Sequence, residues 1–223
     1  MNAPSSPESA RPPLRVAVLA SGRGSNLQAL HRAQTEGRLP IALAGVFSDK
    51  PESGALAYAR THGLPAEALR PSEFESREHF DRALMRAAAA VRPDLIVCAG
   101  YMRILSKDGI RAAPCPMINI HPSLLPKFPG LHTHARVLAA GETEHGASVH
   151  VVNEVLDGGR VLAQARVPVR AGDDPSQLAE RVLSREHPLL IATVRAIADG
   201  RIRLQDAGTA RVSWLHDDDL DLE

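Results

Sequence analysis

The feature that most constrains the fold is an alternation of short apolar runs with segments of helical pattern. Residues 15–20, 41–47 and 95–99 have the composition of buried strands, whereas residues 26–36 and 54–62 have helical spacing of apolar side chains. Strands and helices that alternate in this way usually form parallel strands joined by crossover helices. The sequence therefore predicts an α/β fold.

Further elements are predicted toward the end of the chain. Ser72 and Glu75 are expected to form a capping box that opens a long helix reaching Ala90. Residues 121–130 contain three prolines and a glycine, which predict a long ordered loop. The other expected elements are strands over residues 117–120, 147–152 and 160–169, and a final helix capped by Asp174 that runs to Asp199.

The length of 223 residues fits one large domain. Residues 1–13 are rich in proline and serine, so we expect a disordered leader there. The main domain is expected over residues 14–205, followed by an acidic C-terminal tail over residues 206–223.

Charge and composition favour a protein that acts on small molecules. Lysine plus arginine and aspartate plus glutamate each number 26, so the formal net charge is zero and no general basic field attracts nucleic acid or membranes. The sequence contains no apolar stretch of about 18 residues, and its start lacks the apolar core of a signal peptide. We therefore expect a cytoplasmic protein with no nucleic-acid or membrane partner.

A glycine-rich loop follows the first predicted strand. Residues 21–26, Ser-Gly-Arg-Gly-Ser-Asn, open the first predicted helix, so their backbone amides could bind an anion such as phosphate. The alternative is an ordinary strand-to-helix turn capped by Ser25 or Asn26. The motif alone does not decide between them.

Asn119 and His121 lie two residues apart at the end of a predicted strand. Side chains at this spacing share one face, and ligands in α/β sheets bind beyond the carboxyl ends of strands. An amide and an imidazole together could stabilise an oxyanion and move a proton during acyl transfer. The alternative is a capping asparagine and a packed histidine.

Asp157 and a group of histidines complete the candidate residues. Asp157 lies in Leu-Asp-Gly-Gly, where it could be a site residue or simply part of a turn. His132, His134, His145 and His150 lack the helical or cysteine spacing of a catalytic zinc site. We therefore predict no metal.

Five motifs occur in a characteristic order along the chain. They are Ser21–Asn26, Gly100–Leu105 (Gly-Tyr-Met-Arg-Ile-Leu), Asn119–His134 with its proline loop, Gly146–His150 (Gly-Ala-Ser-Val-His) and Leu156–Gly159. Together they closely resemble the phosphoribosylglycinamide formyltransferases over residues 14–204. The resemblance implies the formyltransferase fold, a Rossmann-like, mostly parallel sheet with flanking helices. Tyr101 departs from the family pattern, in which phenylalanine is common.

The resemblance also implies the reaction. Members of this family transfer the formyl group of 10-formyltetrahydrofolate, a co-substrate, to glycinamide ribonucleotide (GAR) in de novo purine biosynthesis, without a metal. A monomer or a weak homodimer is expected. By resemblance, the catalytic residues would be Asn119, His121 and Asp157, and the GAR-binding residues Gly24, Ser25, Asn26 and Glu186. The folate-binding residues would be Arg77, Met102, Arg103, Ile104, Leu105, Asn119, Asn153, Glu154, Val155, Leu156 and Asp157.

Related activities remain as alternatives. Formyltetrahydrofolate deformylase and methionyl-tRNA formyltransferase share the Asn-x-His and aspartate residues, but both usually carry an additional domain that this length is not expected to accommodate. A non-catalytic phosphate or nucleotide sensor would keep the glycine loop but would not need Asn119, His121 and Asp157.

Overall fold

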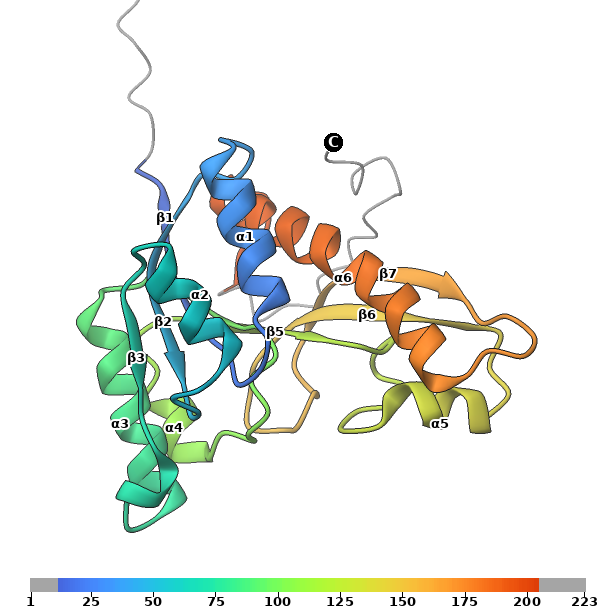
Figure 1. Cartoon of the computed structure of the whole chain (residues 1–223), viewed down its shortest axis with the longest axis horizontal. Coiled ribbons are helices and arrows are strands. Elements are labelled where there is room, and N and C mark those ends of the chain that lie inside the picture. The colour runs from blue at the N-terminus through green and yellow to red at the C-terminus, as the bar shows by residue number, and fades with distance from the viewer. Residues whose placement is uncertain (1–11, 205–223) are drawn as a thin grey trace, which may run out of the picture.

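A seven-stranded sheet runs through the computed structural model of the chain, which describes residues 12–204 (Figure 1). The strands are β1 (Leu14–Leu19), β2 (Ile41–Ser48), β3 (Ala66–Ala68), β4 (Leu95–Cys98), β5 (Met117–His121), β6 (Glu144–Val151) and β7 (Val161–Pro168). Their order across the sheet is β3-β2-β1-β4-β5-β6-β7. The first five are parallel, and β6 and β7 are antiparallel to their neighbours. The predicted mostly parallel α/β fold is confirmed.

Helices cover both faces of this sheet. They are α1 (Ser25–Thr35), α2 (Gly54–Thr61), α3 (Arg77–Ala90), α4 (Lys107–Arg111), α5 (Thr133–Ala139) and α6 (Pro175–Ala198), with a short 3-10 turn, η1 (Pro71–Glu73). The apolar side chains of α1, α2 and α6 pack in one cluster, and those of α3 pack in a second cluster that α4 also contacts. The long predicted elements agree with this structure within a few residues, whereas β3, α4 and α5 were not predicted.

The predicted start of α3 is wrong. Ser72 lies inside the 3-10 turn η1, and α3 begins only at Arg77. Ser76 is the capping residue, and its side chain accepts a hydrogen bond of 3.2 Å from the amide of His79. Pro71 opens this short turn, and the extended backbone of Phe74 (φ −120°, ψ 145°) ends it, so α3 begins only after a second cap.

Replacing Ser76 with alanine is expected to destabilise the protein by about 1 kcal/mol, because the first turn of α3 loses its cap. The matched change Ser72→Ala should alter the free energy of unfolding by less than about 0.5 kcal/mol, as surface substitutions usually do. Urea unfolding of both variants measures the difference. Equal losses would show that Ser76 does not act as the cap.

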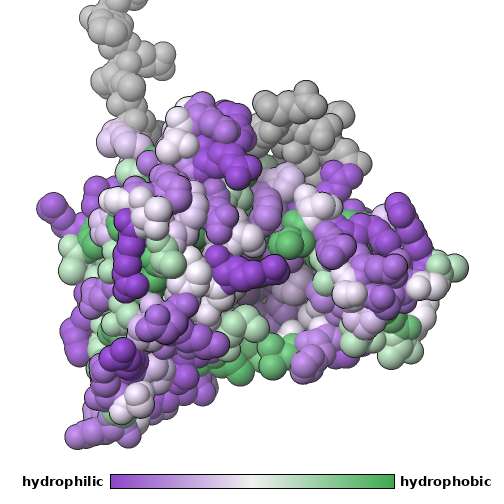
Figure 2. Space-filling view, viewed as in Figure 1, coloured by the Kyte–Doolittle hydropathy of each residue, from purple (hydrophilic) through white to green (hydrophobic). Residues whose placement is uncertain are grey.

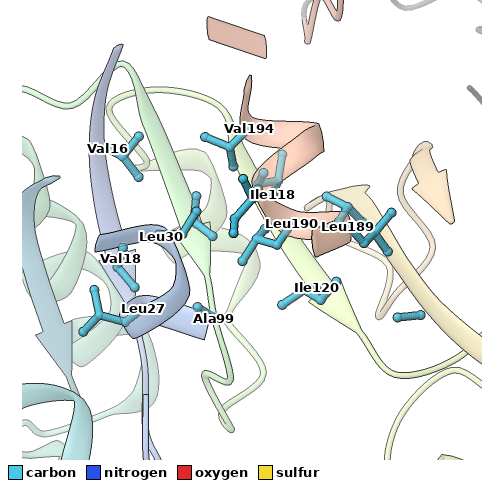
Figure 3. Close-up of a cluster of buried hydrophobic side chains, with 14 of the residues drawn as sticks. Val16, Val18, Leu27, Leu30, Ala99, Ile118, Ile120, Leu189, Leu190 and Val194 are labelled. Atoms are coloured by element: carbon cyan, nitrogen blue, oxygen red, sulfur yellow. The ribbon is translucent and has the colours of Figure 1, made fainter. Parts of the chain in front are cut away.

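The two apolar clusters lie on opposite faces of the sheet. Figure 3 shows side chains of β1, α1, β5 and α6 meeting in the larger cluster, among them Val18, Leu27, Ile118 and Leu190. All four residues of β4 are buried, which confirms its predicted place as a central strand. This core fixes the strand ends, and therefore the loops that follow β1, β4 and β5.

The reversal of direction at β6 also determines what lies beside the end of β5. Because β6 pairs antiparallel with β5, Asn119 is directly opposite His150, and His121 is opposite Ser148. Residues far apart in the sequence are therefore brought together near the carboxyl end of β5.

Most of the predicted leader, residues 1–11, and the predicted tail, residues 206–223, lie outside the described residues. The domain boundary near residue 205 therefore stays a prediction. Within residues 12–204, none of the helices combines the length and the apolar character needed to cross a membrane.

Candidate active site

A cavity of about 610 Å³ opens beyond the carboxyl ends of β4 and β5. Its wall combines residues 100–105, the end of β5, residues 130–134 and residues 152–157. The exposed large apolar side chains of the wall are Met102, Ile104, Leu131, Val155 and Leu156. Figure 2 shows hydrophobic side chains at the surface between the part of the molecule that carries α4 and the part that carries α5. Apolar walls with a few polar groups are typical of a small-molecule site.

His121 and Asp157 meet in this cavity, and only 8 % of each side chain is exposed. His121 Nδ1 lies 3.5 Å from Asp157 Oδ2, and His121 Nε2 lies 3.1 Å from the carbonyl oxygen of Phe128. Because a carbonyl oxygen only accepts hydrogen bonds, Nε2 is the nitrogen that carries a hydrogen in this arrangement. A proton added at Nδ1 would then face the Asp157 carboxylate.

Burial has the largest effect on the pKa of His121 and lowers it. The charge of Asp157 and the carbonyl of Phe128 raise this pKa, while the charges of His150 and Arg136 lower it. Asp157 therefore favours the imidazolium, as an opposite charge beside the ring does. Burial outweighs it, so the pKa of His121 lies below its ordinary value and the neutral ring predominates at neutral pH.

Asn119 is held by a second histidine. Its Nδ2 lies 3.1 Å from Nε2 of His150, and Nδ1 of His150 lies 3.0 Å from the carbonyl oxygen of Val151. A hydrogen on Nδ1 of His150 leaves Nε2 free to accept from Asn119. An amide nitrogen carries two hydrogens, so Asn119 keeps one donor for a ligand. Sequence reasoning considered His150 only as a metal ligand, and the antiparallel pairing of β5 with β6 is the signal that it lacked.

Asp157 lies in a tight turn, and its side chain lines the cavity. Its φ angle is 49°, a conformation that aspartate tolerates better than most residues. At Gly159 an added Cβ would lie 1.7 Å from the carbonyl oxygen of Val151, so only glycine fits there. Asp157 Oδ2 accepts a hydrogen bond of 2.8 Å from the amide of Gly130.

The pKa of Asp157 is lowered overall. Burial has the largest single effect and raises the pKa, but the two histidines beside the carboxylate, His150 and His121, and the amide of Gly130 lower it together. The side chain is therefore a carboxylate at neutral pH.

The glycine loop leaves the first turn of α1 without a side-chain cap from the described residues. The capping residue is Gly24, with φ 79°, so the alternative that Ser25 or Asn26 caps the helix is wrong. An added Cβ at Gly24 would lie 2.8 Å from Cα of Ala55 in α2, which explains why glycine is needed. The uncapped amides remain available for an anion.

Asn26 connects this loop to α6. Its Nδ2 donates to Glu186 Oε2 over 3.3 Å, and both residues line the cavity. Burial raises the pKa of Glu186 most strongly, and the bond from Asn26 partly opposes that rise. Within residues 12–204, the buried Oδ1 of Asn26 has no hydrogen-bond partner.

The chain is similar to known proteins over most of its length. Residues 14–194 match the formyl transferase family. The chain belongs to this family. It is 42 % identical to the phosphoribosylglycinamide formyltransferase of Escherichia coli (strain K12) over 202 residues, which are 91 % of this chain and 93 % of the relative.

Solved structures of the formyl transferase family have the same fold as this chain. Glycinamide ribonucleotide transformylase 1 from Symbiobacterium toebii is 39 % identical, with a TM-score of 0.83 over 87 % of this chain and 92 % of the other. The phosphoribosylglycinamide formyltransferase from Coxiella burnetii is 43 % identical, with a TM-score of 0.80 over 85 % of this chain and 89 % of the other. The predicted formyltransferase fold is therefore confirmed.

Most of the residues predicted to bind ligands line the cavity of this formyl transferase. Those on the cavity wall are Asn26, Met102, Arg103, Ile104, Leu105, Asn119, His121, Asn153, Glu154, Val155, Leu156, Asp157 and Glu186. Gly24 and Ser25 lie just outside this wall, at the start of α1. Arg77 also lies outside it, on α3, where its Nε is 3.8 Å from Asp81 Oδ2.

A second pair of histidines lies near His121. His134 Nδ1 is 3.0 Å from His145 Nε2, and His145 is buried. Burial is the main cause that lowers the pKa of His145 from its ordinary 6.5 to about 4, and the charges of His134 and His121 add to it. Burial also lowers the pKa of His134. No group of three metal-ligating side chains is found within residues 12–204.

These lowered pKa values predict that acid destabilises the protein. A histidine whose folded pKa is lowered stabilises the fold above its unfolded pKa, and this stabilisation is lost as the pH falls from 6.5 toward 4. Each such histidine contributes a slope of up to about 1.4 kcal/mol per pH unit. Urea unfolding between pH 7 and pH 4 should therefore show a shallower slope for His145→Gln than for the unmodified chain. Equal slopes for His145→Gln and the unmodified chain would contradict the assignment.

Proposed function

We propose that this formyl transferase transfers the formyl group of 10-formyltetrahydrofolate to the amine of GAR, a step of purine biosynthesis, in the cytoplasm. The observation that carries the proposal is the convergence of Asn119, His121 and Asp157 in one cavity that has an apolar wall. The relatives named above act as phosphoribosylglycinamide formyltransferases according to their names. The cavity would hold both small-molecule substrates at once.

The start of α1 would bind the phosphate of GAR. Backbone amides at Gly24, Ser25 and Asn26 meet an anion at the positive end of the helix, without competition from a side-chain cap. Oδ1 of Asn26, which has no hydrogen-bond partner among residues 12–204, and the carboxyl of Glu186 would accept hydrogen bonds from polar groups of the same substrate. These groups place the amine of GAR inside the cavity.

The wall on the other side would bind the folate. Residues 102–105 and 153–157 combine exposed apolar side chains with polar ones such as Asn153, which suits a flat heteroaromatic ring. Arg77 lies farther out, so it would contact only a part of the folate that extends beyond the cavity.

The reaction needs positioning, an oxyanion partner and a route for one proton. The amine of GAR attacks the formyl carbon, and the carbonyl oxygen becomes negatively charged. The second Nδ2 hydrogen of Asn119 and the Nε2 hydrogen of His121 would stabilise that oxygen. The Nε2 hydrogen of His121 would then bond to the oxygen in addition to the Phe128 carbonyl, or in place of it. The proton lost by the amine is delivered to N10 of the folate as the bond between N10 and the formyl carbon breaks.

A spectrophotometric assay tests this proposal. The protein is incubated with 10-formyltetrahydrofolate, with and without GAR, and the absorbance of the released tetrahydrofolate is followed. We expect release only when GAR is present. Release without GAR would support a deformylase, and no release under either condition would support a non-catalytic sensor.

A further inference from the structure

Residues 128–131 form a loop beside His121 and Asp157, and Arg136 of α5 contacts this loop. Nη1 of Arg136 donates to the carbonyl oxygens of Pro129, at 2.5 Å, and Leu131, at 3.4 Å. The guanidinium also lies over the ring of Phe128, 5.5 Å from its centre. Arg136 therefore contacts three of the four residues from Phe128 to Leu131, while the fourth, Gly130, lies between its two carbonyl partners.

The peptide group between Pro129 and Gly130 links this cation to the reacting centre. Its carbonyl oxygen accepts from Arg136, and its N–H donates to Asp157 Oδ2 over 2.8 Å. A peptide group is planar, so fixing the direction of the carbonyl also fixes the direction of the N–H. A cation at the carbonyl end polarises the group and strengthens the bond that the N–H makes with a carboxylate.

We propose that Arg136 is a positioning residue for the reacting centre, because it orients the Pro129–Gly130 peptide whose N–H holds Asp157 in place. The inference rests on the proposed function for its consequences in catalysis, whereas the contact geometry is independent of the substrate. Arg136 itself touches neither His121 nor Asp157 through a hydrogen bond in the described structure, so it acts through the loop.

The backbone conformation of the loop explains why contacts from Arg136 are needed. Phe128, Gly130 and His132 all have positive φ angles, of 54°, 77° and 57°. Two of these are not glycine, and this conformation costs about 1 kcal/mol or more at each such residue. Contacts from outside the loop must therefore hold it in this shape, and Arg136 supplies several of them.

Loss of the contacts from Arg136 is expected to raise the pKa of Asp157. The groups that face Asp157 are His121, His150 and the amide of Gly130, and all three lower its pKa. A rotated Pro129–Gly130 peptide would remove the third, so the pKa of Asp157 should rise. Misplacing a reacting group by about 1 Å can reduce turnover by as much as about a hundredfold.

The test compares three variants. In Arg136→Ala, kcat for formyl transfer should fall by about tenfold to a hundredfold, with a smaller change in KM for either substrate. In Arg136→Lys the charge remains, but the planar fork and its stacking on Phe128 are lost, so only part of kcat should return. Lys127→Ala is the matched control, because Lys127 is a loop cation that pairs with Glu142.

A second readout does not depend on activity. The carboxyl carbon of Asp157, followed by 13C NMR during a pH titration, should show a raised pKa in Arg136→Ala and an unchanged pKa in Lys127→Ala. The proposal is overturned if Arg136→Ala leaves both kcat and this pKa unchanged, or if Arg136→Lys equals the unmodified chain in both. If the unmodified chain does not transfer the formyl group, the proposed function fails, while the titration still decides whether Arg136 positions Asp157.

Discussion

Removing Asn119 and His121 together is expected to reduce turnover little more than removing either one alone. Loss of a single oxyanion donor typically reduces turnover by about a hundredfold to a thousandfold. Groups that act as a unit lose most of their effect with the first deletion, so the two losses should not add. The structure supports this expectation because both side chains project from β5 into one cavity.

The measurement is a double-mutant cycle with Asn119→Ala, His121→Ala and the pair. Binding of a folate analogue should be measured for each variant, since an intact site must be shown before turnover is compared. His62→Ala, at an exposed histidine that ends α2 and does not line the cavity, is a suitable control. Near-normal turnover in either single variant, with binding intact, would contradict the catalytic assignment. The interpretation of Asn119 and His121 as a capping asparagine and a packed histidine would then replace it.

Replacing Asp157 with asparagine is expected to lower both turnover and the pKa of His121. Asparagine tolerates the positive φ of this position, and its Oδ1 can still accept from Gly130, so the turn should keep its shape. Only the negative charge is removed. That charge raises the pKa of His121 against the effect of burial, so its loss lets burial lower this pKa further.

The lower pKa of His121 should also change how the turnover of Asp157→Asn depends on pH. If the imidazolium of His121 passes the proton to N10, a lower pKa means that this form is populated only at lower pH, and the acidic-to-neutral limb of the rate profile should move to lower pH. Turnover near pH 7 should fall by about a hundredfold, which is the lower range for loss of acid–base catalysis. Rates between pH 5 and pH 8 and an NMR titration of His121 measure both changes. An unchanged profile with a folded protein would show that Asp157 does not support the imidazolium.

The sequence predicted the long elements of this fold well, for a physical reason. Strands such as β4 are buried on both faces and therefore have continuous apolar sequences, and Asp174 caps α6 by a capping box that the sequence contains. Short elements give no such signal. β3 has three residues and α4 has five, so neither is long enough to show a period, and their positions depend on packing.

The candidate site was predicted in part. The period of a strand placed Asn119 and His121 on one face, and the resemblance added Asp157, which the structure brings to 3.5 Å from His121. The contacts that orient these residues come from backbone groups and from antiparallel pairing. The carbonyl of Phe128, the amide of Gly130 and the ring of His150 have no local sequence pattern that marks them. The wrong prediction of Ser72 as the cap of α3 also reflects backbone structure that has no local pattern. The turn η1 contains Ser72, so Ser76 caps the helix instead.

The fate of a labelled formyl group tests the central claim most directly. The unmodified protein is mixed with GAR and 10-formyltetrahydrofolate that carries 13C in its formyl group, and the product is followed by 13C NMR. The account predicts a formamide signal on GAR, formed in equal amount with tetrahydrofolate, and no such signal from the Asn119→Ala, His121→Ala double variant at the same time point. Label that appears as free formate, or equal formamide from both proteins, would contradict it.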